Sequence, residues 1–308
     1  MKTFFTMTWR NIKLFMKDKG MFFASLITPA ILLVLYVTFL ANVYRDSMPE
    51  GLSEKLVNGM VAGEVMSSML AVICVTVAFC SNLVMVQDKI SGAQKDFSIT
   101  PVRKSTLAVS YFVATFAVTM LITLVAMALC LIYVGASGWY MSAGDVFLLL
   151  LDVILLTLFG TVLSSLVNCF VNTQGQASAV GTIVSAGYGF FCGAYMPIDS
   201  MGKGMQGFMG LLPGTYGTSL VRNHSLNGAL GELANIGAPQ EVIDKIRDSV
   251  DCNLYFFGTK VSITACYLVI TLTILVALGL YILLSYLIAK NKIRFKEPKL
   301  KNRRLRLR

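Results

Sequence analysis

Six long apolar stretches alternate with shorter polar segments along the 308 residues of the chain. Each stretch has about the 20 residues that a helix needs to cross the hydrocarbon core of a bilayer. Backbone groups in lipid must be hydrogen-bonded within their own segment, so the pattern favours helices, and the short alternation of a membrane barrel is absent. The sequence therefore predicts an all-α polytopic membrane protein with six transmembrane helices. The predicted spans are residues 21–41, 61–86, 107–135, 145–170, 177–196 and 261–289.

Lys and Arg are concentrated in alternate connecting segments. Five precede the first predicted span, four lie in residues 87–106 and ten lie in residues 290–308, whereas the loop after the third span has none. The positive-inside rule then places both termini in the cytoplasm. We expect the protein in a plasma (inner) membrane. The net charge of +10 mostly reflects this topology and does not indicate nucleic-acid binding. The basic tail is interpreted as a solvated anchor, with a clamp for anionic lipids as the alternative.

Residues 1–20 predict an amphipathic helix that lies in the inner membrane interface. Phe5, Trp9, Ile12 and Met16 follow helical spacing and form one apolar stripe, and the basic residues gather about a quarter turn away. Such a helix buries its apolar face among lipid headgroups and acyl chains.

Residues 87–106 combine charged residues with a few apolar ones and end in a Thr-Pro turn directly before the next span. We predict a short cytoplasmic helix here. The segment resembles the coupling helix of type-2 ATP-binding-cassette (ABC) exporter permeases, although Ile90 and Ala93 stand where that family often has Glu and Thr. The resemblance assigns coupling to the ATPase to Asp88, Lys89, Gly92, Phe97, Thr100, Pro101 and Val102.

Residues 197–258 carry a second resemblance to the same family. The sequence Gly-Ala-Tyr-Met-Pro closes the fifth span, Leu-Pro-Gly-Thr-Tyr follows it, and an Arg stands six residues beyond that Tyr. A second Pro, usual shortly after the first, is absent. The resemblance implies an extracellular re-entrant helical hairpin with a small cap. The residues assigned to the hairpin are Gly193, Pro197, Pro213 and Tyr216.

The resemblance implies a membrane subunit that works with other chains. No G-x-x-x-x-G-K-[ST] motif is present, so this chain is expected to bind no nucleotide or other cofactor, with ATP and Mg on a cytoplasmic ABC ATPase subunit. A second permease subunit, identical or a paralogue, completes the expected assembly. The short inner loops resemble those of exporters for drugs, antimicrobial peptides or lipid-like molecules.

Two features of the spans are candidates for the substrate path. Asp152 lies inside the fourth span, where a carboxylate marks either a cation or proton contact or a hydrogen bond to a neighbouring helix. Gly181, Ser185 and Gly189 place small residues at four-residue spacing, which is typical of close helix packing. The resemblance puts that face near the subunit interface, and packing within one subunit is the alternative.

The other polar residues are interpreted as structural. Glu64 and Asp145 are expected at solvated helix ends, and the lone His224 is expected to be solvated or to cap a helix. Residues 217–231 are expected to form a loop or broken helix, and a helical pattern begins at Pro239.

No spacing of Cys or His typical of a metal site occurs in the sequence. A disulfide between Cys192 and Cys252 is disfavoured without being excluded, because free buried cysteine is common in apolar surroundings.

The sequence lacks the motifs of an intramembrane enzyme, with one His, no H-E-x-x-H and no G-x-S-x-G. A self-contained secondary transporter or channel remains the alternative function. Such a protein would often show broken helices at corresponding positions of two halves, whereas only the fifth span is predicted to be broken.

Overall fold

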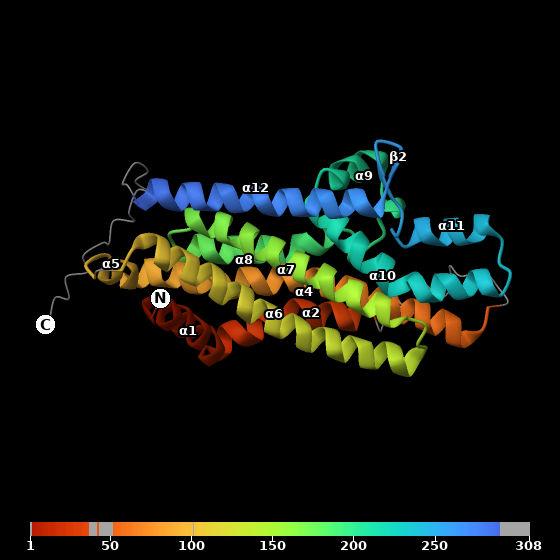
Figure 1. Cartoon of the computed structure of the whole chain (residues 1–308), viewed down its shortest axis with the longest axis horizontal. Coiled ribbons are helices and arrows are strands. Elements are labelled where there is room, and N and C mark those ends of the chain that lie inside the picture. Colours follow the sequence, from red (N-terminus) through yellow and green to blue (C-terminus); the bar gives the residue numbers. More distant parts are fainter. Residues whose placement is uncertain (1, 37–41, 43–51, 101, 290–308) are drawn as a thin grey trace, which may run out of the picture.

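The computed structural model describes residues 2–36, 42, 52–100 and 102–289. In this part of the chain the fold is all-α apart from one two-stranded hairpin, and the long helices run side by side along the long axis (Figure 1). Within it, four helices are long and apolar enough to cross a membrane. They are α4 (Glu54–Ser91), α6 (Lys104–Ser137), α7 (Ala143–Phe170) and α12 (Ile263–Ala289). The first three contain the second, third and fourth predicted spans, and α12 covers the sixth apart from its first two residues.

The first and fifth predicted spans correspond to shorter helices. Helix α2 (Lys19–Leu35) covers part of the first span, and residues 37–41 of that span lie outside the described residues. Helix α8 (Gln174–Phe191) has 18 residues and begins with a polar turn, so it does not reach the apolar content of the other four. It ends before residue 196 because Gly193 adopts a left-handed backbone with φ of 75°. The six-span topology thus stays a prediction.

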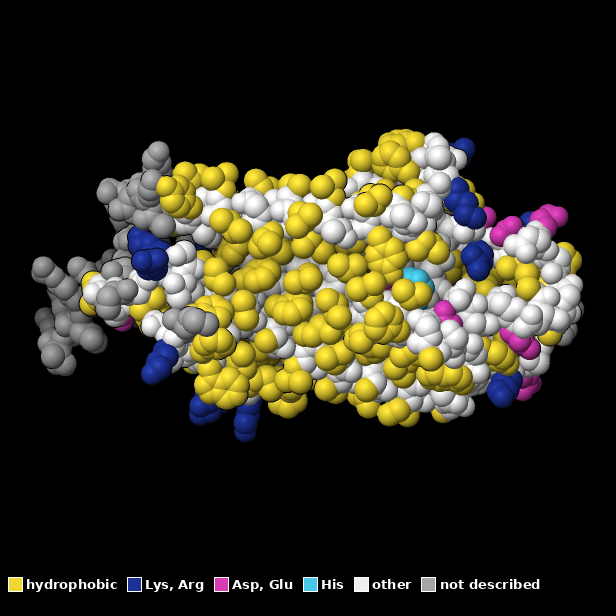
Figure 2. Space-filling view, in the orientation of Figure 1, with side chains coloured by type: hydrophobic (Ala, Val, Ile, Leu, Met, Phe, Trp, Pro, Cys, Tyr) yellow, Lys and Arg dark blue, Asp and Glu magenta, His cyan; other side chains and the backbone are white. Residues whose placement is uncertain are grey.

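Helix α4 is the centre of the bundle and is buried over most of its length, with α2, α6, α7, α8 and α10 packed around it. Its contact with α7 is close enough that a Cβ atom on Gly160 would lie 2.5 Å from the carbonyl oxygen of Cys74. Helix α12, by contrast, exposes large apolar side chains such as Leu268 and Leu272. The surface of the bundle is accordingly a broad apolar belt with charged side chains at its two ends (Figure 2).

Helix α1 (Lys2–Lys17) lies across one end of the bundle against α6 (Figure 1). Its buried face carries Met7 and Phe15, whereas most of the predicted stripe points away from the protein: Phe5, Trp9 and Met16 are exposed, and Ile12 is partly buried. The helix therefore has two apolar faces, one on the bundle and one available to a membrane surface. A short helix, α5 (Ala93–Ser98), follows α4 at the same end, where the sequence predicts one. We call this the α5 end of the bundle.

The opposite end carries a small cap. It consists of η2 (Ile198–Ser200), α9 (Lys203–Gly210), α10 (Pro213–Asn235), α11 (Gln240–Ser249) and the antiparallel strands β1 (Leu254–Phe256) and β2 (Thr259–Val261). Leu254 pairs with Val261 and Phe256 with Thr259. Helix α11 confirms the helical pattern predicted after Pro239, with Ile243 and Ile246 buried.

Helix α10 corrects the expectation of a loop or broken helix at residues 217–231, because it is continuous and largely buried. The glycines in this segment permit close packing. A Cβ atom on Gly217 would lie 2.3 Å from the Leu156 side chain, and one on Gly228 would lie 1.9 Å from the Tyr140 carbonyl oxygen. Glycine here removes a clash between α10 and the neighbouring chain segments, which outweighs its modest cost in helix propensity.

Candidate functional site

The turn between α4 and α5 depends on one glycine. Gly92 is both the C-cap of α4 and the N-cap of α5, with φ of 86°. Among the described residues, no atom lies within 4 Å of a Cβ placed there. The left-handed backbone, and not lack of space, therefore explains why glycine occupies this position. At the far end of α5 the Thr100 hydroxyl donates to the Phe97 carbonyl oxygen at 2.7 Å. Val102 is partly buried, and Pro101 lies outside the described residues.

Asp88, at the end of α4, joins three helices. Arg10 of α1 donates to it through both guanidinium nitrogens, Nη1 to Oδ2 at 2.6 Å and Nη2 to Oδ1 at 2.9 Å. The Tyr111 hydroxyl of α6 donates to the same carboxylate. The hydrogen bonds that Arg10 donates to Asp88 raise the pKa of Arg10, which keeps the guanidinium charged. The guanidinium also lies 5.0 Å from the centre of the Phe97 ring, so α5 takes part in the same cluster.

Lys89, the next residue, attaches α4 to α7. Its Nζ donates to the carbonyl oxygens of Asn168 (2.7 Å), Cys169 (2.9 Å) and Val171 (3.2 Å) at the end of α7. These carbonyls have no partner within the helix, and a cation there also complements the helix dipole. The two coupling residues thus contact the bundle itself. The exposed apolar side chains nearby are Ile90 and Ile99, the latter 86% exposed.

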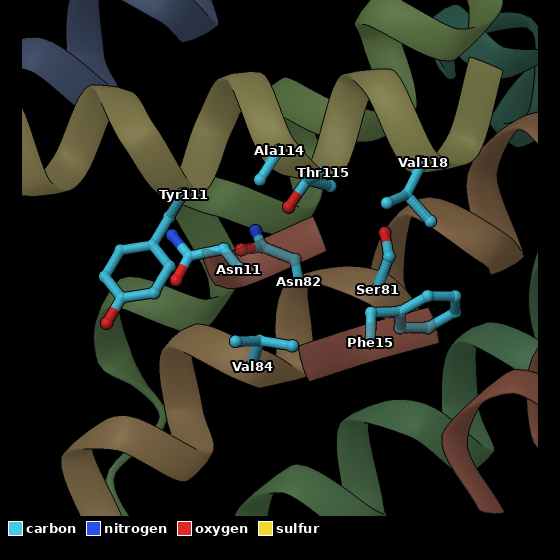
Figure 3. A pocket seen from close by; sticks show the side chains of 9 residues that line it. All are labelled: Asn11, Phe15, Ser81, Asn82, Val84, Tyr111, Ala114, Thr115 and Val118. Atoms are coloured by element: carbon cyan, nitrogen blue, oxygen red, sulfur yellow. The ribbon is translucent and has the colours of Figure 1, made fainter. Parts of the chain in front are cut away.

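A small cavity lies between α1, α4 and α6, close to this cluster (Figure 3). Its volume is about 10 Å³, comparable to the space that one water molecule requires. The amide nitrogen Nδ2 of Asn11 and the amide oxygen Oδ1 of Asn82 are buried without a protein hydrogen-bond partner. Among the described residues, these two amide atoms beside the cavity thus have no protein partner. The lining residues are Asn11, Phe15, Ser81, Asn82, Val84, Tyr111, Ala114, Thr115 and Val118.

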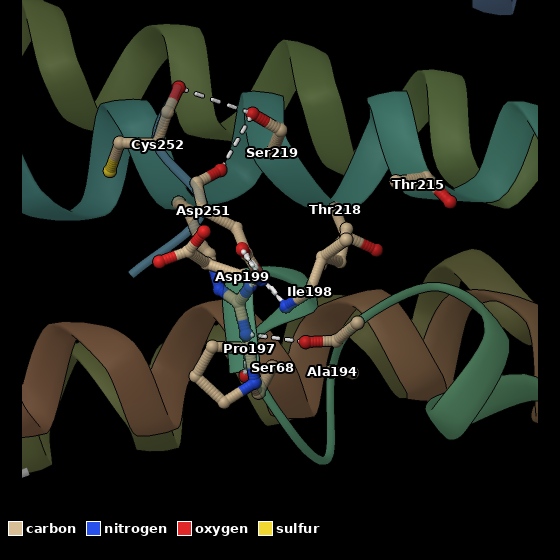
Figure 4. Close-up of polar contacts among 12 residues, drawn as sticks. Ser68, Ala194, Pro197, Ile198, Asp199, Thr215, Thr218, Ser219, Asp251 and Cys252 are labelled. Carbon is tan, nitrogen blue, oxygen red and sulfur yellow. Dashed lines mark hydrogen bonds and ion pairs between the residues drawn. The ribbon is translucent and has the colours of Figure 1, made fainter. Parts of the chain in front are cut away.

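A second ionic cluster lies at the cap end, around the buried side chain of Arg222 in α10. Its guanidinium contacts Glu64 of α4 and Asp251 of the cap, each at 2.8 Å. It also donates to the Gly193 carbonyl oxygen at 2.8 Å. Asp251 in turn accepts from the backbone N–H of Ile198 at 2.8 Å (Figure 4). The expectation that Glu64 is a solvated helix end is thus wrong, because its partner comes from a helix far away in the sequence.

A third polar cluster joins α7, α10 and α12. Asp152 Oδ2 lies 2.5 Å from His224 Nδ1, and the Tyr267 hydroxyl donates to Asp152 Oδ1 at 2.6 Å. His224 is not solvated as expected, since its side chain is only 10% exposed. A part of the ring reaches the apolar surface of the bundle (Figure 2). The sequence left open whether Asp152 contacts a cation or proton or forms hydrogen bonds to neighbouring helices. In the structure it forms such hydrogen bonds to α10 and α12.

Asp145 is likewise buried and not at a solvated end as expected. It forms a capping box with Ser142 at the start of α7 and accepts from Asn227 Nδ2 at 2.8 Å. Cys192 and Cys252 are free thiols in the structure. Among the described residues, no group of three or more His, Cys, Asp and Glu side chains is arranged to hold a metal ion.

These observations together define a polytopic helical protein whose α4–α5 turn is attached to three other helices. A family model described as ABC-2 type transporter matches residues 2–224 of the chain. The chain belongs to this family. The matched region runs from α1 into the first half of α10, so it contains the α5 end and Arg222, while Asp251 and Tyr267 lie beyond it. A comparison with curated proteins finds no match.

Membership makes the chain a multi-pass membrane subunit of an ABC-2 type transporter. Its residues predicted to form an outer hairpin have specific local roles. Gly193 provides the left-handed turn after α8, Pro197 precedes η2, and Pro213 is the first residue of α10. The Tyr216 hydroxyl donates to the Gly210 carbonyl oxygen at 2.6 Å, which holds α9 against α10. The depth of this pair in the membrane stays a prediction.

The small residues of α8 in this ABC-2 protein divide into two groups. Gly189 faces the Tyr195 ring, so that a Cβ atom would lie 2.3 Å from the ring, which is packing within the subunit. A Cβ on Gly181 would meet nothing within 4 Å, and Ser185 is partly exposed. The middle of α8 therefore offers an open face of small residues on the described subunit.

Proposed function

We propose that this chain is the membrane-spanning permease subunit of an ATP-driven exporter in a plasma membrane, with both termini in the cytoplasm. A separate cytoplasmic ABC ATPase hydrolyses ATP with Mg, and the cargo is a hydrophobic or amphipathic molecule such as a drug, an antimicrobial peptide or a lipid-like compound. Family membership supports the transport role. The positive-inside pattern of Lys and Arg supports the orientation, and resemblance to bacterial exporters supports the direction and cargo class.

The observation that carries the proposal is the construction of the α5 end. Asp88 and Lys89 attach the end of α4 to α1, α6 and α7, while Ile90 and Ile99 remain exposed beside α5. A force applied at α5 is thus transmitted to several helices at once. Coupling by such an element requires that its contacts differ between at least two states. The hydrogen bonds around Asp88 are contacts that can break and re-form between such states.

The open face of α8 supports a second permease subunit, identical or a paralogue. Gly181 and Ser185 are free to approach another helix closely, and Ile183 beside them is exposed. Small residues of this kind allow helix backbones to pack tightly in membranes. We place the substrate path along this face, and assign Asp152 to holding α7, α10 and α12 together.

The test is purification of the tagged chain from its native membrane in mild detergent, followed by mass spectrometry and an ATPase assay. We expect an ABC ATPase subunit and ATPase activity in the eluate of the wild type. Ile99→Asp should remove both, because it places a charge on the most exposed apolar side chain beside α5. Ile236→Asp is the matched control, since it changes an exposed Ile at the cap end.

The outcome also decides between the proposal and a self-contained secondary transporter or channel. A chain that purifies without an ATPase, and transports after reconstitution alone, would establish the alternative. Equal loss of the ATPase in Ile99→Asp and Ile236→Asp would contradict the assignment of the docking surface to the α5 end.

A further inference from the structure

The turn between β1 and β2 has an unusual residue. Phe257 and Gly258 are its two central residues, and both have positive φ, 47° and 85°. Two-residue hairpin turns of this kind favour Asn-Gly or Asp-Gly, because a bulky side chain is strained in the left-handed region. Phe257 is nevertheless 74% exposed and fills no space in the core. An exposed aromatic residue at a strained position points to a contact outside the chain.

Other apolar side chains continue the surface of Phe257. The ring of Phe256 lies edge-on to it at 4.8 Å, and α9 packs against β1. These side chains, together with those that α9 exposes, form one apolar patch, which we call the aromatic foot. The foot consists of Met205, Phe208, Leu211, Phe256 and Phe257.

The position of the foot relates it to the membrane. Strand β2 ends at Val261, and α12, whose exposed apolar face makes it a lipid-facing helix, begins at Ile263. Helix α9 and the hairpin stand out sideways from the bundle beside this end of α12 (Figure 1). The space-filling view shows apolar side chains over the projecting part and Lys or Arg side chains farther toward the cap end (Figure 2). The foot thus continues the lipid-facing surface at the level where α12 leaves the hydrocarbon.

We propose that the aromatic foot lies in the headgroup and upper acyl region of the leaflet at the cap end, as a membrane anchor for the cap. Aromatic side chains are enriched at this depth of a bilayer, and short amphipathic helices bind there through their apolar face. The inference rests on the membrane fold and the geometry of the cap. It does not depend on the direction of transport or on the ATPase partner.

The anchor has a consequence for the cap. Helix α9 follows η2, whose first residue, Ile198, donates its backbone N–H to Asp251 of the Arg222 cluster. The foot and the cluster therefore hold the segment after α8 from two sides, one in lipid and one in the protein core.

The experiment uses the full chain with Trp9→Phe and Trp139→Phe, which remove both native tryptophans. Phe257→Trp is added as a probe, and Ile236→Trp at the far end of α10 is the matched control. Each is reconstituted in phosphatidylcholine vesicles with bromine on the upper acyl chain. We expect strong loss of tryptophan emission for Phe257→Trp and little loss for Ile236→Trp. Equal loss in the two would overturn the proposal, and so would blue-shifted but unquenched emission, which indicates burial against a second copy or another protein.

A second variant separates lipid binding from folding. Phe257→Asn places a residue that favours the left-handed region in the turn, so the hairpin should remain intact. With Phe208→Trp as the probe, we expect Phe257→Asn to reduce quenching by brominated lipid while circular dichroism stays unchanged and thermal stability is equal or higher. Undiminished quenching with an intact fold would overturn the assignment of Phe257 as the anchoring residue.

Discussion

The two ionic clusters at opposite ends of α4 contain similar groups but are built differently. At the cap end Arg222 is fully buried and is bound by two carboxylates and a backbone carbonyl. At the α5 end the Arg10 side chain is 30% exposed, is paired with one carboxylate and lies near a small cavity. A buried charge whose partners are all protein groups is costly to separate, whereas water can replace the partners of an exposed one.

This difference assigns different mechanical properties to the two ends. The cap-end cluster holds α4, α10 and the cap in one arrangement. The α5-end cluster joins α1, α4 and α6 through contacts that can be exchanged with water at a smaller cost. We therefore expect rearrangement during transport at the α5 end, and the following predictions test that contrast.

The largest effect is expected for Arg222→Met. The change removes the guanidinium that contacts two buried carboxylates, Glu64 and Asp251, and it should lower the free energy of unfolding by about 3–5 kcal/mol. Thermal or denaturant unfolding in detergent measures this. Lys245→Met, which removes an exposed ion pair with Glu241 on α11, is the control and should have little effect. A variant Arg222→Met as stable as this control would disprove the rigid character of the cap-end cluster.

A smaller effect is expected for Gly92→Ala. A side chain at φ of 86° is strained, which should cost roughly 1–2 kcal/mol or shift the α4–α5 turn. Gly231→Ala in α10 is the control, since a Cβ there meets nothing within 4 Å, and it should stabilise the helix by about 0.5–1 kcal/mol. Unfolding measurements on both, with transport and ATPase activity of the assembled transporter, check the prediction. Unchanged stability and transport in Gly92→Ala would count against a fixed geometry of this turn.

Arg10→Lys should reduce stability still less, by roughly 1 kcal/mol or below, because the site is partly exposed. Lysine keeps the charge but loses the paired hydrogen bonds to Asp88. The effect should appear mainly as weaker stimulation of ATPase activity by substrate in proteoliposomes. If stability falls as far as in Arg222→Met while coupling is unaffected, the two clusters have the same structural role.

The smallest effect is expected in the labelling of cysteines with maleimide. Cys252, beside Asp251, is buried, and burial raises the pKa of its thiol, so it should resist maleimide at neutral pH until the protein unfolds. Two variants are compared, each with a single cysteine. One keeps only Cys252, and the other carries only the cysteine introduced by Ile99→Cys. Because Ile99 is exposed at the α5 end, we expect this variant to react readily. Rapid labelling of Cys252 in the folded protein would show that the cap opens.

Local features of the fold could be predicted from the sequence. Long apolar runs predicted α4, α6, α7 and α12, and the charged segment before the Thr-Pro turn predicted α5, because apolar spacing and turn residues are local signals. The pattern after Pro239 predicted α11 for the same reason. Helix α8 was overestimated, since its apolar run continues past Gly193, where the backbone turns.

Features that depend on distant partners could not be predicted. Glu64 and His224 were expected in solvent because their partners, Arg222 and Asp152, are far away in sequence. The α5-end cluster likewise unites Arg10 with Asp88, and local spacing carries no sign of that pair. Residues 217–231 were expected to form a loop or broken helix, because only the packed structure shows that Leu156 occupies the space a side chain at Gly217 would need.

Helix α4 carries both ionic clusters on a single continuous axis. Glu64 and Asp88 are 24 residues apart in one uninterrupted helix, which corresponds to about 36 Å, somewhat more than the hydrocarbon thickness of a bilayer. Because the buried contacts around Arg222 fix α4 near Glu64, any tilt of the helix would move its other end most. A tilt of a few degrees about Glu64 would displace Asp88 by an ångström or more, enough to break and re-form hydrogen bonds at the α5 end without disturbing those around Arg222.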